Sequence, residues 1–229
     1  MSKKWLAKLL LVLILTLSIA CGVIGFSAFA NRRKVKALLA EIQDPRWTSA
    51  TFEDARNFSE KYGGHAVGHG LSAPLTPEDY PANFGCNKNS CRFSIAVSNT
   101  PLFQLHLAPQ TVFGADLQVE GDRVTRIDFG LMSLKKEKGE EFALAVEVIE
   151  EFCYPCYDGQ QPYSAHFGWD YRAEPPVALA VHLTPASTRA QRHSAYGLNL
   201  ACLTKLGGCT DARALSPELW DRTETERPK

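Results

Sequence analysis

Neither sign of charge is in excess in this chain of 229 residues, which carries 25 Lys and Arg against 25 Asp and Glu. A nucleic-acid-binding domain usually shows a pronounced basic excess, so the balance argues against a nucleic-acid partner. No internal repeat and no low-complexity tract occurs, and a composition with 45% hydrophobic and 22% charged residues is that of an ordinary globular protein. These features exclude a disordered or repeat protein and allow one core of good size.

Complete catalytic motifs are also missing. The chain contains no G-x-S-x-G nucleophile turn, no phosphate-binding G-x-x-x-x-G-K-[ST] loop and no EF-hand calcium loop. The glycine-rich segment 63–70 is not a dinucleotide-binding fingerprint, because a predicted helix rather than a strand precedes it. We therefore predict a non-catalytic binding or assembly domain without a cofactor or a resident metal.

The strongest pattern lies at the N-terminus. Lys3, Lys4 and Lys8 precede an uncharged run over residues 9–30, and charge resumes at Arg32. The 22 residues of this run would span about 33 Å as a helix at roughly 1.5 Å per residue, enough to cross a hydrocarbon layer about 30 Å thick. We expect residues 1–30 to form a transmembrane signal-anchor, with residues 9–30 in the membrane.

Two other interpretations of this segment stay open. Ala28-Phe29-Ala30 has the A-x-A form of a signal-peptide cleavage site, although the run is longer than the about 7–15 apolar residues usual in such a peptide. Lipid modification of Cys21 is the other, but the apolar run continues well past that cysteine. Charge does not fix the orientation of the segment, because basic residues flank both of its ends.

Six of the seven cysteines follow the apolar run and fall into three close pairs, namely Cys86/Cys91, Cys153/Cys156 and Cys202/Cys209. An even set of cysteines is typical of disulfides formed in an oxidising compartment. We expect neighbour-to-neighbour pairing as the simplest of the connectivities that the count allows. The cysteines thus predict an extracytoplasmic domain, periplasmic if the protein is bacterial, with free buried cysteines in a cytosolic domain as the alternative.

Cys153-Tyr154-Pro155-Cys156 is the most suggestive short motif. A C-x-x-C pair can lower a thiol pKa and exchange disulfides, and over these four residues the chain resembles the active site of the thioredoxin-like oxidoreductases. The resemblance implies an exposed nucleophile at Cys153 and a resolving thiol at Cys156. In that family the motif opens a helix, whereas a loop composition follows Cys156, so a structural disulfide is the preferred interpretation.

His65 and His69 lie four residues apart in the glycine-rich segment and form a candidate ligand loop. The glutamate of an H-E-x-x-H metal motif is missing, and glycines disfavour the helix on which two such histidines would share a face. A plain surface loop is therefore preferred, with a metal site at His65/His69 as the alternative. Zinc held by cysteines is disfavoured, because only Cys153/Cys156 has the C-x-x-C spacing.

Past residue 30 the patterns predict two short helices and then a series of strands. Helical spacing of apolar residues occurs over 35–42 and 51–62, and from residue 91 onward the alternation has a period of two. The expected strands are 92–98, 102–107, 112–119, 124–129, 140–152, 177–183 and 195–203, with a hairpin turn at Glu120-Gly121-Asp122. We predict an α+β fold, mainly antiparallel β, either as an open sheet or as a sandwich, and the short connections argue against parallel pairing.

The chain therefore divides into a transmembrane signal-anchor over 1–30, a helical stalk over 31–62, a β-rich soluble domain over 63–215 and a polar tail over 216–229. We expect a membrane-anchored extracytoplasmic domain with a binding or assembly role, whose partners are the membrane and another protein. A thiol–disulfide oxidoreductase using Cys153 and Cys156 is one alternative function. A metal-binding domain using His65 and His69 is the other.

Overall fold

A seven-stranded sheet lies at the centre of the computed structural model, which describes residues 3–67, 86–137, 140–152, 163–167 and 178–225. Its strands are β1 (His65–Val67), β2 (Ser90–Ser98), β3 (Gln110–Glu120), β4 (Arg123–Glu137), β5 (Glu140–Glu151), β6 (Tyr163–Phe167) and β7 (Ala178–Leu183). They are ordered β1-β2-β3-β4-β5-β7-β6, and every pair is antiparallel except β5 with β7. The predicted α+β class with a mainly antiparallel sheet is confirmed, while the parallel pair departs from the expectation.

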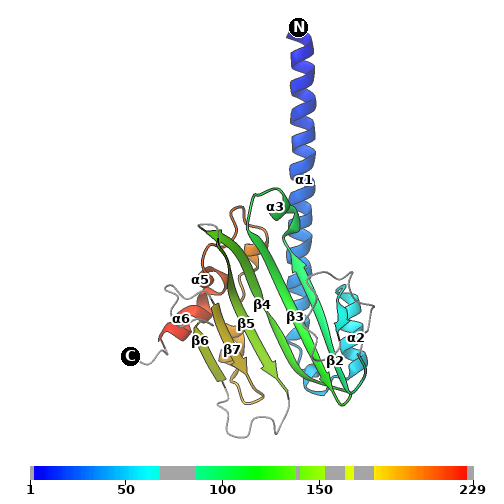
Figure 1. Cartoon of the computed structure of the whole chain (residues 1–229), viewed down its shortest axis with the longest axis vertical. Helices are drawn as coiled ribbons and strands as arrows, with labels where there is room; N and C mark the ends of the chain where they lie inside the picture. Colours follow the sequence, from blue (N-terminus) through cyan, green and yellow to red (C-terminus); the bar gives the residue numbers. More distant parts are fainter. Residues whose placement is uncertain (1–2, 68–85, 138–139, 153–162, 168–177, 226–229) are drawn as a thin grey trace.

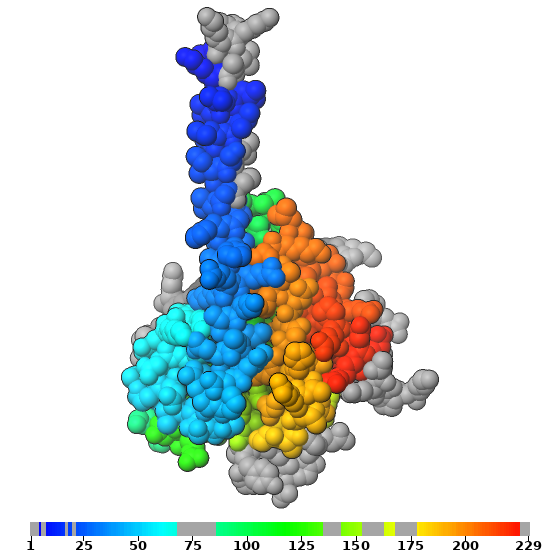
Figure 2. Space-filling model, turned by 180° about the vertical axis from the view of Figure 1, so that it is seen from behind, coloured from blue at the N-terminus to red at the C-terminus, as the bar shows by residue number. Residues whose placement is uncertain are grey.

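Helices cover one face of this sheet. They are α1 (Lys3–Ile42), η1 (Pro45–Ser49), α2 (Phe52–Lys61), α3 (Thr100–Gln104), α4 (Arg189–Ala195), η3 (Leu200–Leu203), α5 (Ala212–Leu215) and α6 (Pro217–Thr225). Figure 1 shows the strands from their open side, and Figure 2 shows α1, α2 and the C-terminal segments lying over the opposite side. Helices rather than a second sheet therefore bury the apolar face, and the described residues form one open sheet and no sandwich.

Buried apolar residues alternate with more exposed residues along the central strands and form the core on one face of the sheet. In β3 and β4 the buried residues include Phe113, Leu117 and Ile127, each fully covered on the helix side. The C-terminal part of α1 supplies the matching apolar stripe, with Val35, Leu38, Leu39 and Ile42 at most 6% exposed. Each such side chain contributes roughly 1.5–3 kcal/mol when it is fully buried, so this contact is a main source of stability.

The N-terminal half of α1 projects away from the domain (Figure 1). Its large apolar side chains at Leu9–Leu15, Ile19, Val23, Phe26 and Phe29 are 48–75% exposed. Among the residues that the structure describes, no helix has both the length and the apolar character needed to cross a membrane. The transmembrane signal-anchor over 1–30 stays a prediction.

Several local predictions are confirmed. The segment 51–62 contains α2, and Thr51 and Asp54 form a capping box at its start. Strands β3 and β4 form the predicted hairpin, in which Gly121 and Asp122 take positive φ angles of 59° and 64°. The ambiguous segment 140–152 is a strand, β5, as predicted.

Two predicted strands are wrong, because short helices and turns occupy both segments. The segment 102–107 overlaps α3, in which Pro101 occupies the first turn, where its missing N–H costs nothing. Only Leu102 is buried there, so the apparent alternation has no buried face. The segment 195–203 contains the end of α4 and the turn η3, which Asn199 caps through its side chain.

A close approach of two strands depends on one glycine. Gly114 and Gly130 are cross-strand partners on the open face of the sheet. A Cβ atom added to Gly130 would lie 2.1 Å from the carbonyl oxygen of Val146, whereas a Cβ atom added to Gly114 would meet nothing within 4 Å. Strands β4 and β5 therefore need a residue without a side chain at position 130.

Replacing Gly130 with alanine should lower the free energy of unfolding by about 1–3 kcal/mol, because the added methyl group forces β4 away from β5. The matched control Gly114→Ala should leave stability unchanged or raise it by about 0.4–1 kcal/mol, since alanine has less freedom in the unfolded chain. Denaturant unfolding of both variants measures the difference. Equal stabilities would contradict the close approach.

Candidate functional site

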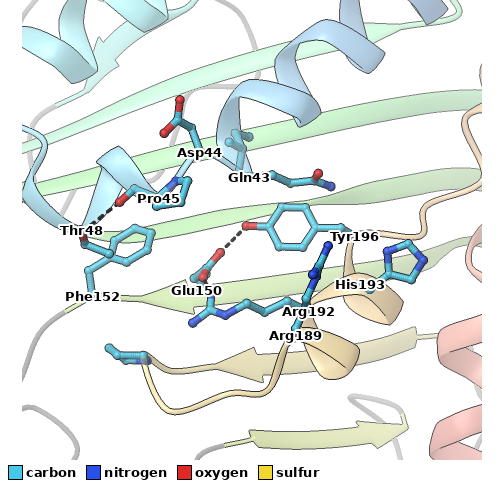
Figure 3. A pocket seen from close by; sticks show the side chains of 12 residues that line it. Gln43, Asp44, Pro45, Thr48, Glu150, Phe152, Arg189, Arg192, His193 and Tyr196 are labelled. Atoms are coloured by element: carbon cyan, nitrogen blue, oxygen red, sulfur yellow. Dashed lines mark hydrogen bonds and ion pairs between the residues drawn. The ribbon is translucent and has the colours of Figure 1, made fainter.

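A cavity of about 680 Å³ opens between the end of α1 and helix α4 (Figure 3). We call it the α4 cavity. Its walls come from the end of α1 with η1, the end of β5, the loop after β7, and α4 itself. The volume lies in the range of about 300–1,000 Å³ that is usual for small-molecule sites.

Helix α4 directs one face toward this cavity. Arg189, Arg192, His193 and Tyr196 all line it, and their spacing of three, four and seven residues from Arg189 places them along one side of a helix. Thr188 caps the helix in a reciprocal capping box with Gln191. The cap fixes where the helix begins and therefore which side chains face the cavity.

Glu150 lies at the floor of the α4 cavity. Because β5 turns Leu144, Val146 and Val148 toward the helices, the next residue in that alternation is Glu150, which is only 3% exposed. The Tyr196 hydroxyl donates a hydrogen bond to this carboxylate (Figure 3), and the Arg192 guanidinium forms an ion pair with it. The buried negative charge is thus compensated by two partners.

Arg192 and Tyr196 are themselves held in place. Nη2 of Arg192 donates to the carbonyl oxygen of Thr184 at 2.7 Å, at the end of β7. The ring of Tyr196 packs on Phe129 with centroids 4.6 Å apart. Burial raises the pKa of the Tyr196 hydroxyl well above its ordinary value, so this group stays protonated and acts as a hydrogen-bond donor.

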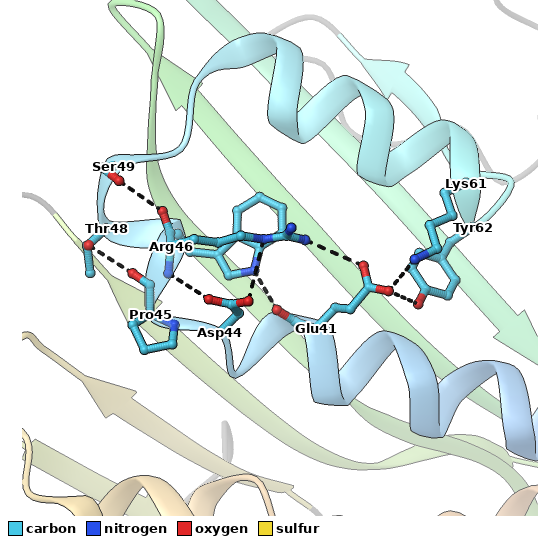
Figure 4. Close-up of polar contacts among 9 residues, drawn as sticks. Glu41, Asp44, Pro45, Arg46, Thr48, Ser49, Lys61 and Tyr62 are labelled. Atoms are coloured by element: carbon cyan, nitrogen blue, oxygen red, sulfur yellow. Dashed lines mark hydrogen bonds and ion pairs between the residues drawn. The ribbon is translucent and has the colours of Figure 1, made fainter.

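The opposite wall is fixed by the contacts of Glu41 at the end of α1 (Figure 4). The Trp47 indole N–H donates to the Glu41 carbonyl at 2.7 Å, and the Tyr62 hydroxyl donates to its carboxylate at 3.0 Å. Lys61 pairs with the same carboxylate. Although partial burial opposes the change, the hydrogen bonds from Lys61 and Tyr62 hold the pKa of the Glu41 carboxyl below its ordinary value. The wall therefore joins α1, η1 and α2 rigidly.

Two arginines, Arg189 and Arg192, and two carboxylates, Asp44 and Glu150, line the α4 cavity. Arg192 and Glu150 compensate each other, and Asp44 lies at the cavity wall with Arg46 as its ion-pair partner at 3.9 Å. Arg189 forms no ion pair with any residue that the structure describes. Its guanidinium is thus available to an anionic group that enters the cavity.

A shallower depression of about 400 Å³ lies on the open face of the sheet, over Gly114, Gly130 and Ala145. Asp128 and Glu147 border it. Burial, together with neighbouring carboxylates, raises the pKa of both side chains, although the Arg126 guanidinium at 2.5 Å opposes the change at Asp128. Apart from carboxylates, the lining of this depression is apolar, so it offers a ligand fewer hydrogen-bond donors than the α4 cavity does.

The predicted ligand and thiol sites are described only in part. His65 begins β1 and pairs with Ser94 across the sheet, whereas His69 lies outside the described residues. Cys153 and Cys156 lie outside them as well. Within the described ranges, no group of three or more His, Cys, Asp and Glu side chains is placed to hold a metal ion.

Two of the three predicted cysteine pairs stand at disulfide distance. The Cα atoms of Cys86 and Cys91 are 4.7 Å apart, and those of Cys202 and Cys209 are 5.2 Å apart. The first pair closes the turn before β2, and the second closes the loop after η3. Both agree with neighbour-to-neighbour pairing.

No protein-family model, curated protein or solved structure matches this chain. The chemistry of the α4 cavity is therefore the basis for a functional proposal. Sequence reasoning missed this cavity, although two signals point to it. The first is the helical spacing of Arg189, Arg192, His193 and Tyr196, and the second is the continuation of the β5 alternation to Glu150.

Replacing Arg192 with methionine should leave the Glu150 carboxylate buried without its counter-ion. Loss of one partner from a buried pair costs about 3–5 kcal/mol, and we expect the lower end because the Arg192 side chain is 31% exposed. Adding Glu150→Gln should restore much of the lost stability. Arg189→Met, on the same helix face, should change stability by less than about 0.5 kcal/mol. Denaturant unfolding separates these outcomes, and equal losses in the two arginine variants would contradict the pairing.

Proposed function

We propose that this protein is a membrane-anchored, extracytoplasmic binding domain without catalytic activity, and that the α4 cavity binds a small anionic ligand. The observation that carries the proposal is the charge arrangement of the cavity. The compensated pair of Glu150 and Arg192 forms its floor, and the guanidinium of Arg189 is left for a ligand.

The side chains that line the cavity indicate which class of ligand would bind there. A guanidinium binds carboxylate and phosphate oxygens with paired, charge-assisted hydrogen bonds. The side chains of Ile42 and Phe152 add apolar surface to the lining of the cavity. The ligand that fits is therefore an anionic oxygen group carried on an apolar body.

The buried side chains of Glu150 and Tyr196 are suited to binding rather than to proton transfer. A general base needs a free carboxylate or imidazole with a pKa near the working pH. The Glu150 carboxylate is occupied by Arg192 and Tyr196, and burial keeps the tyrosine protonated. The side chains of Glu150, Arg192 and Tyr196 therefore form a fixed floor against which a ligand can bind.

Two further features support the anchor and the compartment. The N-terminal half of α1 presents exposed apolar side chains outside the folded domain, as a membrane segment would. The cysteine pairs Cys86/Cys91 and Cys202/Cys209 stand at disulfide distance, as in an oxidising compartment.

Alkylation of the full chain in its native membranes tests the compartment and the anchor together. Once the membranes are dissolved in a denaturing detergent without reductant, a maleimide reagent should not react at Cys86, Cys91, Cys202 or Cys209. All four should react after reduction, because disulfides block them. Cys202→Ser should free one reactive thiol at Cys209. The protein should stay in the membrane fraction after an alkaline carbonate wash. Reaction at any of these four cysteines before reduction would overturn the extracytoplasmic placement, and release by carbonate would overturn the anchor.

Benzoate probes the proposed anion site. It should raise the Tm of the full chain, whereas benzamide, which has the same ring without the charge, should not. Arg189→Gln should weaken benzoate binding by about tenfold or more, the factor expected when a charge-assisted hydrogen bond worth about 1.5–3 kcal/mol is lost.

Arg56→Gln is the matched control for this experiment, because Arg56 on α2 pairs with Glu53 and does not line the cavity. This variant should respond to benzoate as the parent does. Equal responses to benzoate and benzamide would refute anion recognition, as would a benzoate response that survives Arg189→Gln.

A further inference from the structure

Exposed apolar side chains outside α1 gather at one end of the domain. Among the described residues, the large ones are Phe103, Leu105, Leu107, Met132, Leu134 and Leu206, which are 39–68% exposed. We call this set the apolar rim. It comes from three separate segments: α3 with the loop after it, the later part of β4, and the loop after η3.

These three segments meet where α1 leaves the domain. Strand β3 begins at Gln110, shortly after α3, and its first residues pair with the part of β4 that carries Met132 and Leu134. The amide of Gly207 donates to the carbonyl oxygen of Leu107 at 2.8 Å, which joins the loop of Leu206 to that of α3. Figure 1 shows α3 beside α1 at the point where the helix emerges.

Contacts with α1 determine where the apolar rim would lie relative to a bilayer that α1 crosses. Ala28, 5% exposed, forms a small buried cluster with Leu102 and Ala108, and Ile24 packs against the same cluster. Both α1 residues belong to the uncharged run over 9–30. A run of that length inserted in a bilayer places Ile24 and Ala28 near the edge of the hydrocarbon layer. The residues packed beside them then reach the same depth.

The rim is held rigidly against α1. The Asn31 side chain donates to the carbonyl oxygen of Ser98 at 2.9 Å and fixes the rotation of the helix. Cys202 and Cys209 close the loop of Leu206. Within that loop Gly208 has a φ of 66°, and a Cβ atom there would lie 2.6 Å from the Pro109 ring.

Charge is of one sign on the segments of the rim beside α1, whereas the end of β4 and the start of β5, past Leu134, carry acidic residues at Glu137, Glu140 and Glu141 as well as Lys135 and Lys136. The segments 24–40, 99–112 and 199–210 contain no Asp or Glu. Arg32, Arg33 and Lys205 are exposed on them. An apolar surface bordered by cations complements a bilayer that contains anionic phospholipids, in which acyl chains meet the apolar side chains and phosphates meet the basic ones.

We propose that the apolar rim inserts into the interface of an anionic phospholipid membrane, so that the domain sits directly on the bilayer. The inference rests on the proposed anchoring by α1 and adds a second membrane contact to it. Within the predicted stalk over 31–62, Val35, Leu38 and Ile42 are buried against the domain.

Quenching of tryptophan fluorescence by brominated lipids tests this contact. Leu206→Trp and Phe103→Trp would each be made in the full chain with Trp5→Phe, and reconstituted into vesicles of phosphatidylcholine and phosphatidylglycerol with brominated acyl chains. The added fluorescence should be quenched by about half or more, as expected for a side chain at the acyl boundary. Glu120→Trp, at the exposed β3–β4 turn on the opposite end, is the matched control and should not be quenched.

The outcomes separate this inference from the proposed anchor. Flotation of the parent chain with the vesicles reports the anchor alone, and failure to float would overturn the anchor and the inference with it. Flotation with no more quenching at Leu206→Trp and Phe103→Trp than at Glu120→Trp would overturn the inference only. Blue-shifted emission from the rim variants without bromine quenching would assign the rim to a protein partner and would also overturn it.

Discussion

The packing of the C-terminal part of α1 on the sheet is the contact on which the rest of the structure depends. Val35, Leu38 and Ile42 are at most 1% exposed and share one buried cluster with the central strands. This contact gives the apolar face of the sheet its cover without a second sheet. It also places Glu41 where it joins η1 through Trp47 and α2 through Lys61, and so builds one wall of the α4 cavity.

The parallel pairing of β5 and β7 builds the other wall. Parallel strands end at the same edge of a sheet, so Glu150 lies beside Leu183 and the chain leaves β7 next to that carboxylate. Helix α4 follows within a few residues, and Arg192 reaches both Glu150 and the carbonyl oxygen of Thr184. A charge on the apolar side of β5 is tolerated because this return of the chain supplies its counter-ion.

Local patterns in the sequence predict the elements whose neighbours are also local. The cap of α2 at Thr51 and the β3–β4 hairpin are set by residues a few positions apart, and both are found. The segments 102–107 and 195–203 alternate like strands, yet no partner strand lies beside them, so prolines and caps make them helical. The α4 cavity was missed for a similar reason. Its parts come from three segments that lie far apart in the chain, and only the pairing of β5 with β7 brings Glu150 and Arg192 together.

The apolar rim and the α4 cavity contact α1 at different positions along its length. Charges at one of these proposed sites therefore have little effect on charges at the other. Ala28 touches the segment that carries the rim and Ile42 lines the α4 cavity, so roughly 1.5 Å per residue places the two contacts about 21 Å apart. Charges on exposed groups are screened over about 8 Å at physiological ionic strength. With the rim at the membrane interface, anionic headgroups exert little repulsion on an anion held by Arg189. The cavity then opens to ligands dissolved in the aqueous compartment, while the rim and the helix hold it at a fixed distance from the lipid.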